Sequence, residues 1–270
     1  MTTLSDIMRA AWTELGQMTI VAATGGSATT VVDTATRFTT DDALVNGTAL
    51  VISTTDGLTP QGKFSRISDF VASTYTFTID TVTDAIAAGD VIGLARPTIP
   101  HLHMKQAVND ALKDHIGTMS KVDVTLTSAS DDATYTLPAG MFIKRLIDVQ
   151  IDDGSDYYTS ILSKVEILPT TTGAQMLSHD LESGQNIKII YEGLHPELTI
   201  YSSYVHESIP IALLTDGTVQ KALEWLVSKR GDSALGTFLL QRKNEAEQKI
   251  ANAKVEHPVN RVRKAARWFV

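Results

Sequence analysis

The chain has 270 residues, 43% of them hydrophobic and 20% charged, with a formal net charge of −8, as expected for a folded protein with a sizeable core. No apolar run approaches the roughly 18 residues that a membrane helix needs, and the N-terminus lacks the order of a secretory signal. The absence of cysteine excludes disulfides, cysteine nucleophiles and cysteine metal sites.

A first helix is predicted over residues 3–16. Thr3 or Ser5 caps its start and Gly16 ends it. Its apolar residues recur at spacings of three and four and therefore share one face: Leu4, Ile7, Met8, Ala11 and Leu15. A single short helix cannot bury that face alone, so we expect it to dock on another helix.

Residues 18–95 predict an antiparallel β module, either a small barrel or a sandwich. Strict alternation places Tyr75, Phe77 and Ile79 on one face of a strand. The predicted strands are short β-branched runs separated by turn residues: 18–21, 29–33, 49–53, 63–68, 74–79 and 90–94.

The rest of the chain alternates in the same way. A second helix is predicted over residues 98–117, starting at Thr98 or Pro100 and carrying a stripe that includes Met104 and Val108. Residues 121–205 predict a second β region, with its clearest strands at 122–127, 143–151 and 186–191. Two helices follow, one capped by Asp216 or Thr218 and one over about 233–253.

This order predicts an α+β fold: a small helical bundle core with two inserted antiparallel β modules, of barrel or sandwich type, and an extended C-terminal arm. A string of independent domains is the alternative architecture. The predicted parts are the N-terminal bundle helix, a barrel-like module, a bundle helix, a second β module, the C-terminal bundle helices and a basic arm, at residues 1–17, 18–96, 97–120, 121–206, 207–256 and 257–270.

The paired glycines of Gly25-Gly26-Ser27 raise the question of a phosphate-binding loop. A Walker loop needs a lysine after the last glycine, and a dinucleotide loop needs a helix there. Here the next cation is Arg37 and the next element is a predicted strand. We therefore interpret these residues as a turn between strands.

Two further patterns contain residue types that ligate metal ions. His101 and His103 lie two apart on a predicted helix, where they point in different directions and cannot chelate together. The acidic run 152–156 has three carboxylates and a glycine but lacks the spacing of an EF-hand, so it is read as a turn and calcium binding stays open. No residues nominate a catalytic site, and no cofactor is expected.

The end of the chain is basic, whereas the rest is acidic. Residues 1–228 hold 13 Lys and Arg against 27 Asp and Glu, and residues 229–270 hold 10 against 4. The split predicts a tail that meets an acidic partner surface, or else a solvated basic helix. The candidate partner-binding residues combine cations with aromatic rings: Arg261, Arg263, Lys264, Arg267, Trp268 and Phe269. Protein anchoring is favoured over self-packing and over nucleic-acid binding.

These patterns resemble those of tailed-bacteriophage neck proteins, the head-to-tail connector or adaptor family. The resemblance covers most of the chain. One set of runs is similar to a β module of phage structural proteins, at residues 23–33, 41–52, 64–77 and 87–94. Residues 133–151 resemble a β module of neck proteins, and residues 219–230 and 241–250 are similar to their terminal helices.

The resemblance implies a non-enzymatic virion protein, made in the host cytoplasm and located at the neck. Such adaptors form a ring, commonly of twelve copies, whose C-terminal segments reach the portal and whose lumen passes DNA without reading its sequence. The implied partners are further copies, the portal protein and a downstream neck or tail protein; no membrane is involved. Simple adaptors are mostly helical, so the two β modules leave a tail, baseplate or receptor-binding virion protein as the alternative. A β-rich hydrolase is a third class, for which no residue is nominated.

Overall fold

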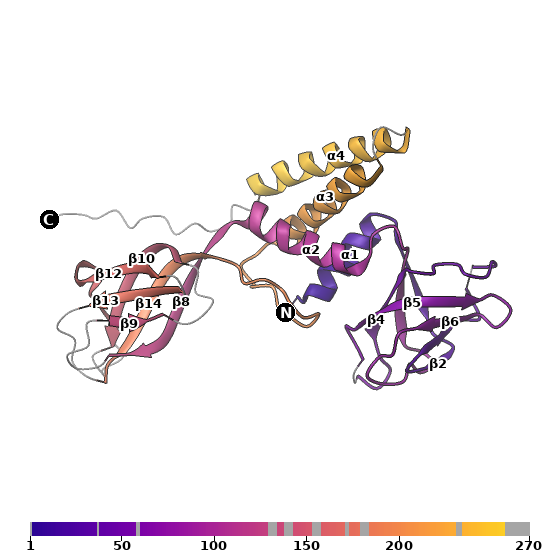
Figure 1. The fold of residues 1–270 in the computed structure, drawn as a ribbon, viewed down its shortest axis with the longest axis horizontal. Helices are drawn as coiled ribbons and strands as arrows, with labels where there is room; N and C mark the ends of the chain where they lie inside the picture. The colour runs from indigo at the N-terminus through magenta and orange to yellow at the C-terminus, as the bar shows by residue number, and fades with distance from the viewer. Residues whose placement is uncertain are drawn as a thin grey trace. The chain divides into compact units, whose positions relative to one another are not determined.

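The computed structural model describes residues 2–36, 38–57, 60–128, 134–137, 143–152, 158–170, 173–178, 184–230 and 234–256. These residues form two compact units (Figure 1). Unit 1 contains the described residues up to 115 and from 197 to 256, and unit 2 contains those from 116 to 196.

The β part of unit 1 is one antiparallel sheet that curls on itself. Its spatial order is β1-β7-β4-β5-β6-β3-β2. β1 and β2 stand at opposite ends of that order, yet only Ala23 and Thr24 separate them in the chain, a span of at most about 11 Å. The two ends of the sheet therefore meet, as in a barrel. The strands are β1 Met18–Ala22, β2 Gly25–Ser27, β3 Thr30–Val32, β4 Thr48–Ser53, β5 Phe64–Val71, β6 Thr76–Ile79 and β7 Val91–Ala95.

The six strands predicted for this region are confirmed to within a few residues, and β2 was missed. β2 contains the glycines that were interpreted as a turn; that interpretation is wrong, because Gly25–Ser27 pairs with Thr30–Val32 and the turn lies at Ala28 and Thr29. A Cβ on Gly26 would lie 2.5 Å from the Thr30 carbonyl oxygen and 3.1 Å from that of Ile86. Glycine is needed here for close backbone approach inside a strand.

The barrel encloses a hydrophobic core that follows from strand alternation. Phe70 of β5 and Phe77 of β6 are fully buried and stack with ring centroids 4.2 Å apart. Ile79 is buried, as predicted, but Tyr75 is 41% exposed. It lies in the turn before β6 with a φ of 55°, so it does not share the strand's inner face.

The chain enters and leaves the barrel at one place, where β1 begins and β7 ends. Met18 of β1 lies opposite Ala95 of β7, and the Arg96 N–H donates to the Gln17 carbonyl oxygen at 2.9 Å. In unit 2, Thr118 and Leu194 are paired in the same manner.

Four α-helices complete the described part of unit 1: α1 Leu4–Glu14, α2 His101–Ala111, α3 Ile211–Arg230 and α4 Ala234–Glu256. A π-helix, η1 Leu112–Ile116, extends α2. The cap of α1 is confirmed: the Thr3 hydroxyl accepts from the Asp6 N–H at 3.3 Å, and the Asp6 carboxylate accepts from the Thr3 N–H at 3.0 Å. The cap of α3 was predicted wrongly, because the helix begins after Pro210, and Thr218 donates to the Leu214 carbonyl oxygen inside it.

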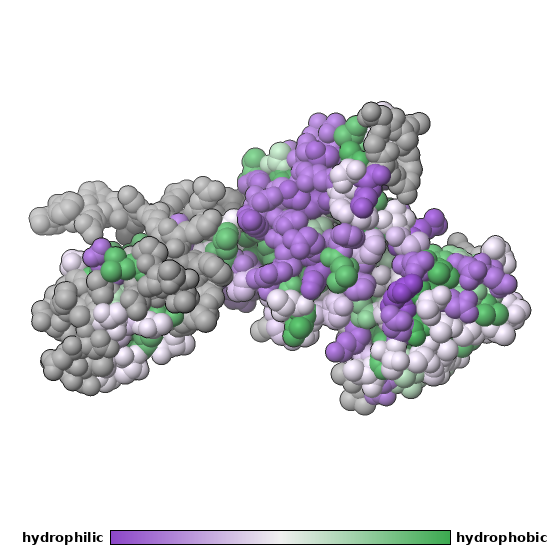
Figure 2. Space-filling model, viewed as in Figure 1, coloured by the Kyte–Doolittle hydropathy of each residue, from purple (hydrophilic) through white to green (hydrophobic). Residues whose placement is uncertain are grey.

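The helices pack on one another, and the predicted apolar stripes of α1 and α2 are largely buried. α3 contacts α1, α2 and α4, and the buried side chains of α1 include Leu4, Ile7, Met8 and Ala11. Hydrophilic residues dominate the visible face of the helices (Figure 2). Among the described helices, none combines the length and the apolar character required to cross a membrane.

The predicted fold class is nevertheless wrong in its central feature. The chain is mostly β, with large antiparallel sheets of seven and four strands, and is α+β only in a loose sense. A buried cluster of a dozen side chains lies inside the barrel, and all of them come from residues 23–94. The β modules thus form cores of their own, and the four described helices are not the core of the molecule.

Unit 2 is a two-layer β structure. Its sheets have the orders β11-β10-β14-β8 and β12-β13-β9. Buried side chains from both sheets form one cluster, including Tyr135 and Met176 from the smaller sheet and Val149 and Ile189 from the larger. The strands are β8 Thr118–Thr127, β9 Thr134–Thr136, β10 Ile143–Asp152, β11 Tyr158–Ser160, β12 Val165–Thr170, β13 Gly173–Ser178 and β14 Asn186–Leu194.

Candidate functional site

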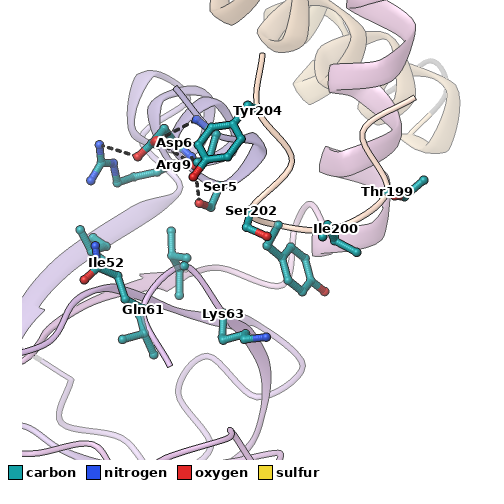
Figure 3. A pocket seen from close by; sticks show the side chains of 15 residues that line it. Ser5, Asp6, Arg9, Ile52, Gln61, Lys63, Thr199, Ile200, Ser202 and Tyr204 are labelled. Atoms are coloured by element: carbon teal, nitrogen blue, oxygen red, sulfur yellow. Dashed lines mark hydrogen bonds and ion pairs between the residues drawn. The ribbon is translucent and has the colours of Figure 1, made fainter. Parts of the chain in front are cut away.

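A pocket of about 760 Å³ opens in unit 1 beside the start of α1 (Figure 3). Three segments far apart in the sequence line it: residues 3–9, the β4 residues 50–52 with the turn 61–63, and residues 199–204. Because the first and last of these segments lie about 190 residues apart, local sequence patterns could not reveal the pocket.

Backbone hydrogen bonds fix the wall formed by residues 199–204. The Leu4 N–H donates to the Ser203 carbonyl oxygen at 2.9 Å, and the Ser5 N–H donates to that of Tyr201 at 3.2 Å. These carbonyls satisfy N–H groups that the first turn of a helix leaves unpaired. The start of α1 therefore presents its donors to its own chain.

A series of tilted aromatic contacts runs from this wall to α1. The Tyr201 ring lies 4.4 Å from the Phe64 ring, and Phe64 lies 5.8 Å from Trp12. The Trp12 indole is fully buried and donates to the Ile99 carbonyl oxygen at 3.2 Å. Burial raises the pKa of the Tyr201 phenol above its ordinary value, so the ring stays neutral near pH 7.

The polar groups of the pocket suit binding. Asp6 is the one carboxylate that lines it, and its oxygens are held by the cap and by Arg9 at 3.4 Å. Two apolar side chains on the rim, Ile200 and Tyr204, are 62% and 59% exposed. The pocket therefore places hydroxyl, amide and apolar groups side by side, and its carboxylate is already hydrogen-bonded within the chain. This mixture is typical of a surface that binds another protein chain.

The two histidines examined as a metal pair lie on the first turn of α2 and contact different rings. His101 stacks on Phe64 at 6.3 Å, and His103 stacks on Trp225 of α3 at 4.3 Å. Burial and then Lys105 lower the pKa of His101, with a smaller opposing effect of Asp80. In the part of the chain that the structure describes, no group of three or more His, Asp or Glu side chains is arranged to hold a metal ion.

A polar cluster at η1 was missed by the sequence analysis. The His115 ring packs against α3 at Gly217, where a Cβ would lie 2.6 Å from the ring's Cδ2. Its Nδ1 lies 3.4 Å from the Lys254 ammonium, and its buried Nε2 has no hydrogen-bond partner. A glycine inside a helical pattern is a signal of close packing that could have pointed to this contact.

Burial and nearby charges lower the pKa of His115. Burial lowers its pKa most, followed by Lys254 and Lys221, while the side chains of Gln220 and Asp114 oppose this. Lys221 also binds Asp114 at 2.7 Å, which ties α3 to η1.

The predicted partner-binding residues lie outside the described residues: Arg261, Arg263, Lys264, Arg267, Trp268 and Phe269. The same holds for most of the acidic run considered for calcium, of which only Asp152, the last residue of β10, is described.

The comparisons with known proteins add no relative: no protein-family model matches the chain, and no curated protein matches it.

Proposed function

We propose that the chain is a structural protein of the bacteriophage neck, a head-to-tail adaptor that forms a ring between portal and tail and lets DNA pass. The barrel of unit 1 is the observation that supports this most. The runs on which the resemblance rests, within residues 23–94, fold together as one self-contained module. A resemblance in sequence pattern is more specific to a family when the matching segments fold together as one structural module.

Exposed apolar side chains give further support. On unit 1, Leu102 of α2, Ile200 and Phe238 of α4 are 61%, 62% and 54% exposed. Large apolar side chains left in water mark surfaces that meet other chains. A ring subunit needs two different surfaces of this kind, because each copy contacts one neighbour on each side.

In this proposal the chain has no catalytic role. The pocket beside α1 serves contact with another protein, and the arm residues 257–270 reach the portal or a neighbouring subunit. The excess of carboxylates over cations in residues 1–228 suits a lumen that repels DNA and lets it slide.

Electron microscopy of the purified chain, alone and with the portal protein of the same phage, tests this function. We expect a ring with a central opening that stacks coaxially on the portal, and light scattering on the eluted species gives the copy number. A monomer that does not bind the portal contradicts the proposal. Immunogold labelling of virions at the baseplate or fibres, away from the neck, would favour the alternative virion role.

A further inference from the structure

One edge of the four-stranded sheet in unit 2 carries exposed apolar side chains. β8 pairs with β14, and no other strand in the described residues pairs with its second side (Figure 1). Val122 and Val124 lie two apart on β8 and are 58% and 56% exposed. An apolar edge strand with an open side is a template for a strand from another chain.

Carboxylates lie on the same face of the sheet as Val122. Val122 is opposite Ile190 of β14, and Ile190 is opposite Asp148 of β10, so the three side chains form a row across three strands. Glu192 lies two residues from Ile190 and shares its face. Lys188, two residues before Ile190, shares this face as well. The surface made by β8 and this row, which we call the β8 face, therefore combines apolar and acidic groups with a lysine.

The charge of unit 2 indicates what covers the β8 face. Residues 116–196 hold 5 Lys and Arg against 11 Asp and Glu, a net charge of −6. Residues 257–270 hold 4 Lys and Arg and no acid, a net charge of +4, together with Trp268 and Phe269. The two segments are complementary in charge, and both offer apolar side chains.

We propose that the C-terminal segment of a second copy, residues 257–270, docks on the β8 face by adding a strand along β8. This inference rests on the proposed function to the extent that a ring supplies the neighbouring copy. The segment is long enough: its 14 residues extend to about 46 Å, and the ten residues of β8 to about 33 Å. The main chain supplies affinity, and the net negative charge of unit 2 attracts the cations of the segment.

Cysteine cross-linking tests this contact. The chain has no cysteine, so every cross-link comes from the introduced residues. Full-length Val124→Cys and Ala265→Cys chains, carrying affinity tags of different mass, are mixed and treated with a short bismaleimide. We expect a heterodimer, because the two cysteines lie on touching copies. Its yield should fall at high salt, since screening weakens the attraction between the segments.

Ile20→Cys serves as the matched control, because its side chain is 52% exposed, close to the 56% of Val124, and lies on β1 of unit 1. We expect the Val124 pair to cross-link about tenfold more than the Ile20 pair, since docking raises the local concentration of the two thiols. Equal yields for the two pairs overturn the inference. It is also overturned if Val124→Cys/Ala265→Cys in one chain cross-links only within itself, because the segment then binds its own unit 2. Circular dichroism of each variant verifies that it is folded.

The two proposals fail separately. A ring on the portal without the Val124–Ala265 cross-link keeps the neck function and removes the β8 contact. A cross-linked oligomer that does not bind the portal keeps the β8 contact and removes the neck function.

Discussion

Gly26 shows how one missing side chain lets β2 lie close to the neighbouring backbone. Its backbone lies against the carbonyls of Thr30 and Ile86, which belong to rigid main chain. We expect Gly26→Ala to lower the free energy of unfolding by about 1–3 kcal/mol, because a Cβ would force β2 away from its neighbours. Gly25→Ala is the control: nothing lies within 4 Å of its Cβ position, so a change below about 0.5 kcal/mol is expected. Urea unfolding of both variants measures the difference, and equal losses would contradict this account.

His115 gives a second prediction at the residue scale, concerning pH. Its folded-state pKa is lowered, so between that value and the unfolded value of 6.5 the unfolded chain binds more protons. Stability is therefore fully present above pH 6.5 and is lost as pH falls through this window. Thermal unfolding between pH 7.5 and pH 5 should show a smaller loss for His115→Gln than for the parent chain. His101, whose pKa is lowered too, has the same sign, so His101→Gln in the same background should remove a further part.

At the scale of elements, α2 and α3 approach closely where Gly217 faces Ala111 and His115. Gly→Ala inside a helix normally stabilises by about 1 kcal/mol. Here the new Cβ would lie 2.6 Å from the His115 ring and 3.1 Å from the Ala111 Cβ, so we expect Gly217→Ala to destabilise. In a double-mutant cycle with His115→Ala, which removes the ring, most of the loss should be recovered. A Gly217→Ala chain more stable than its parent would show that helix propensity outweighs the contact.

At the same scale, sequence patterns predicted some strands and helices correctly and missed others. The runs at residues 49–53 and 63–68 were predicted because they are short runs with β-branched residues between turn signals, and the apolar stripe of α1 because its period is helical. β2 was missed because two glycines carry no strand propensity, and β11 because three residues are too few to show a period. β12 was missed because Pro169 interrupts it.

At the scale of the whole molecule, sequence patterns predicted the parts better than their assembly. Periodicity identifies which face of an element is buried, but it does not say which elements share a core. The helical stripes were therefore given the central role, whereas each β module buries a hydrophobic cluster of its own. The pocket beside α1 was not predicted for the same reason, since Ser5, Lys63 and Tyr201 come from three distant segments.

The paired ends of the two modules have a consequence for how such a chain can change. Met18 and Ala95 bound one module and Thr118 and Leu194 the other, and in each case the two residues are strand partners. A whole module can therefore be replaced or removed as a cassette with a short splice and no change in the path of the flanking helices. The barrel also covers Trp12 through Phe64, so a replacement must supply one aromatic side chain there. Within these two constraints, the outward surfaces of the modules apart from the pocket and the β8 face are free to diverge while the helices keep their sequence.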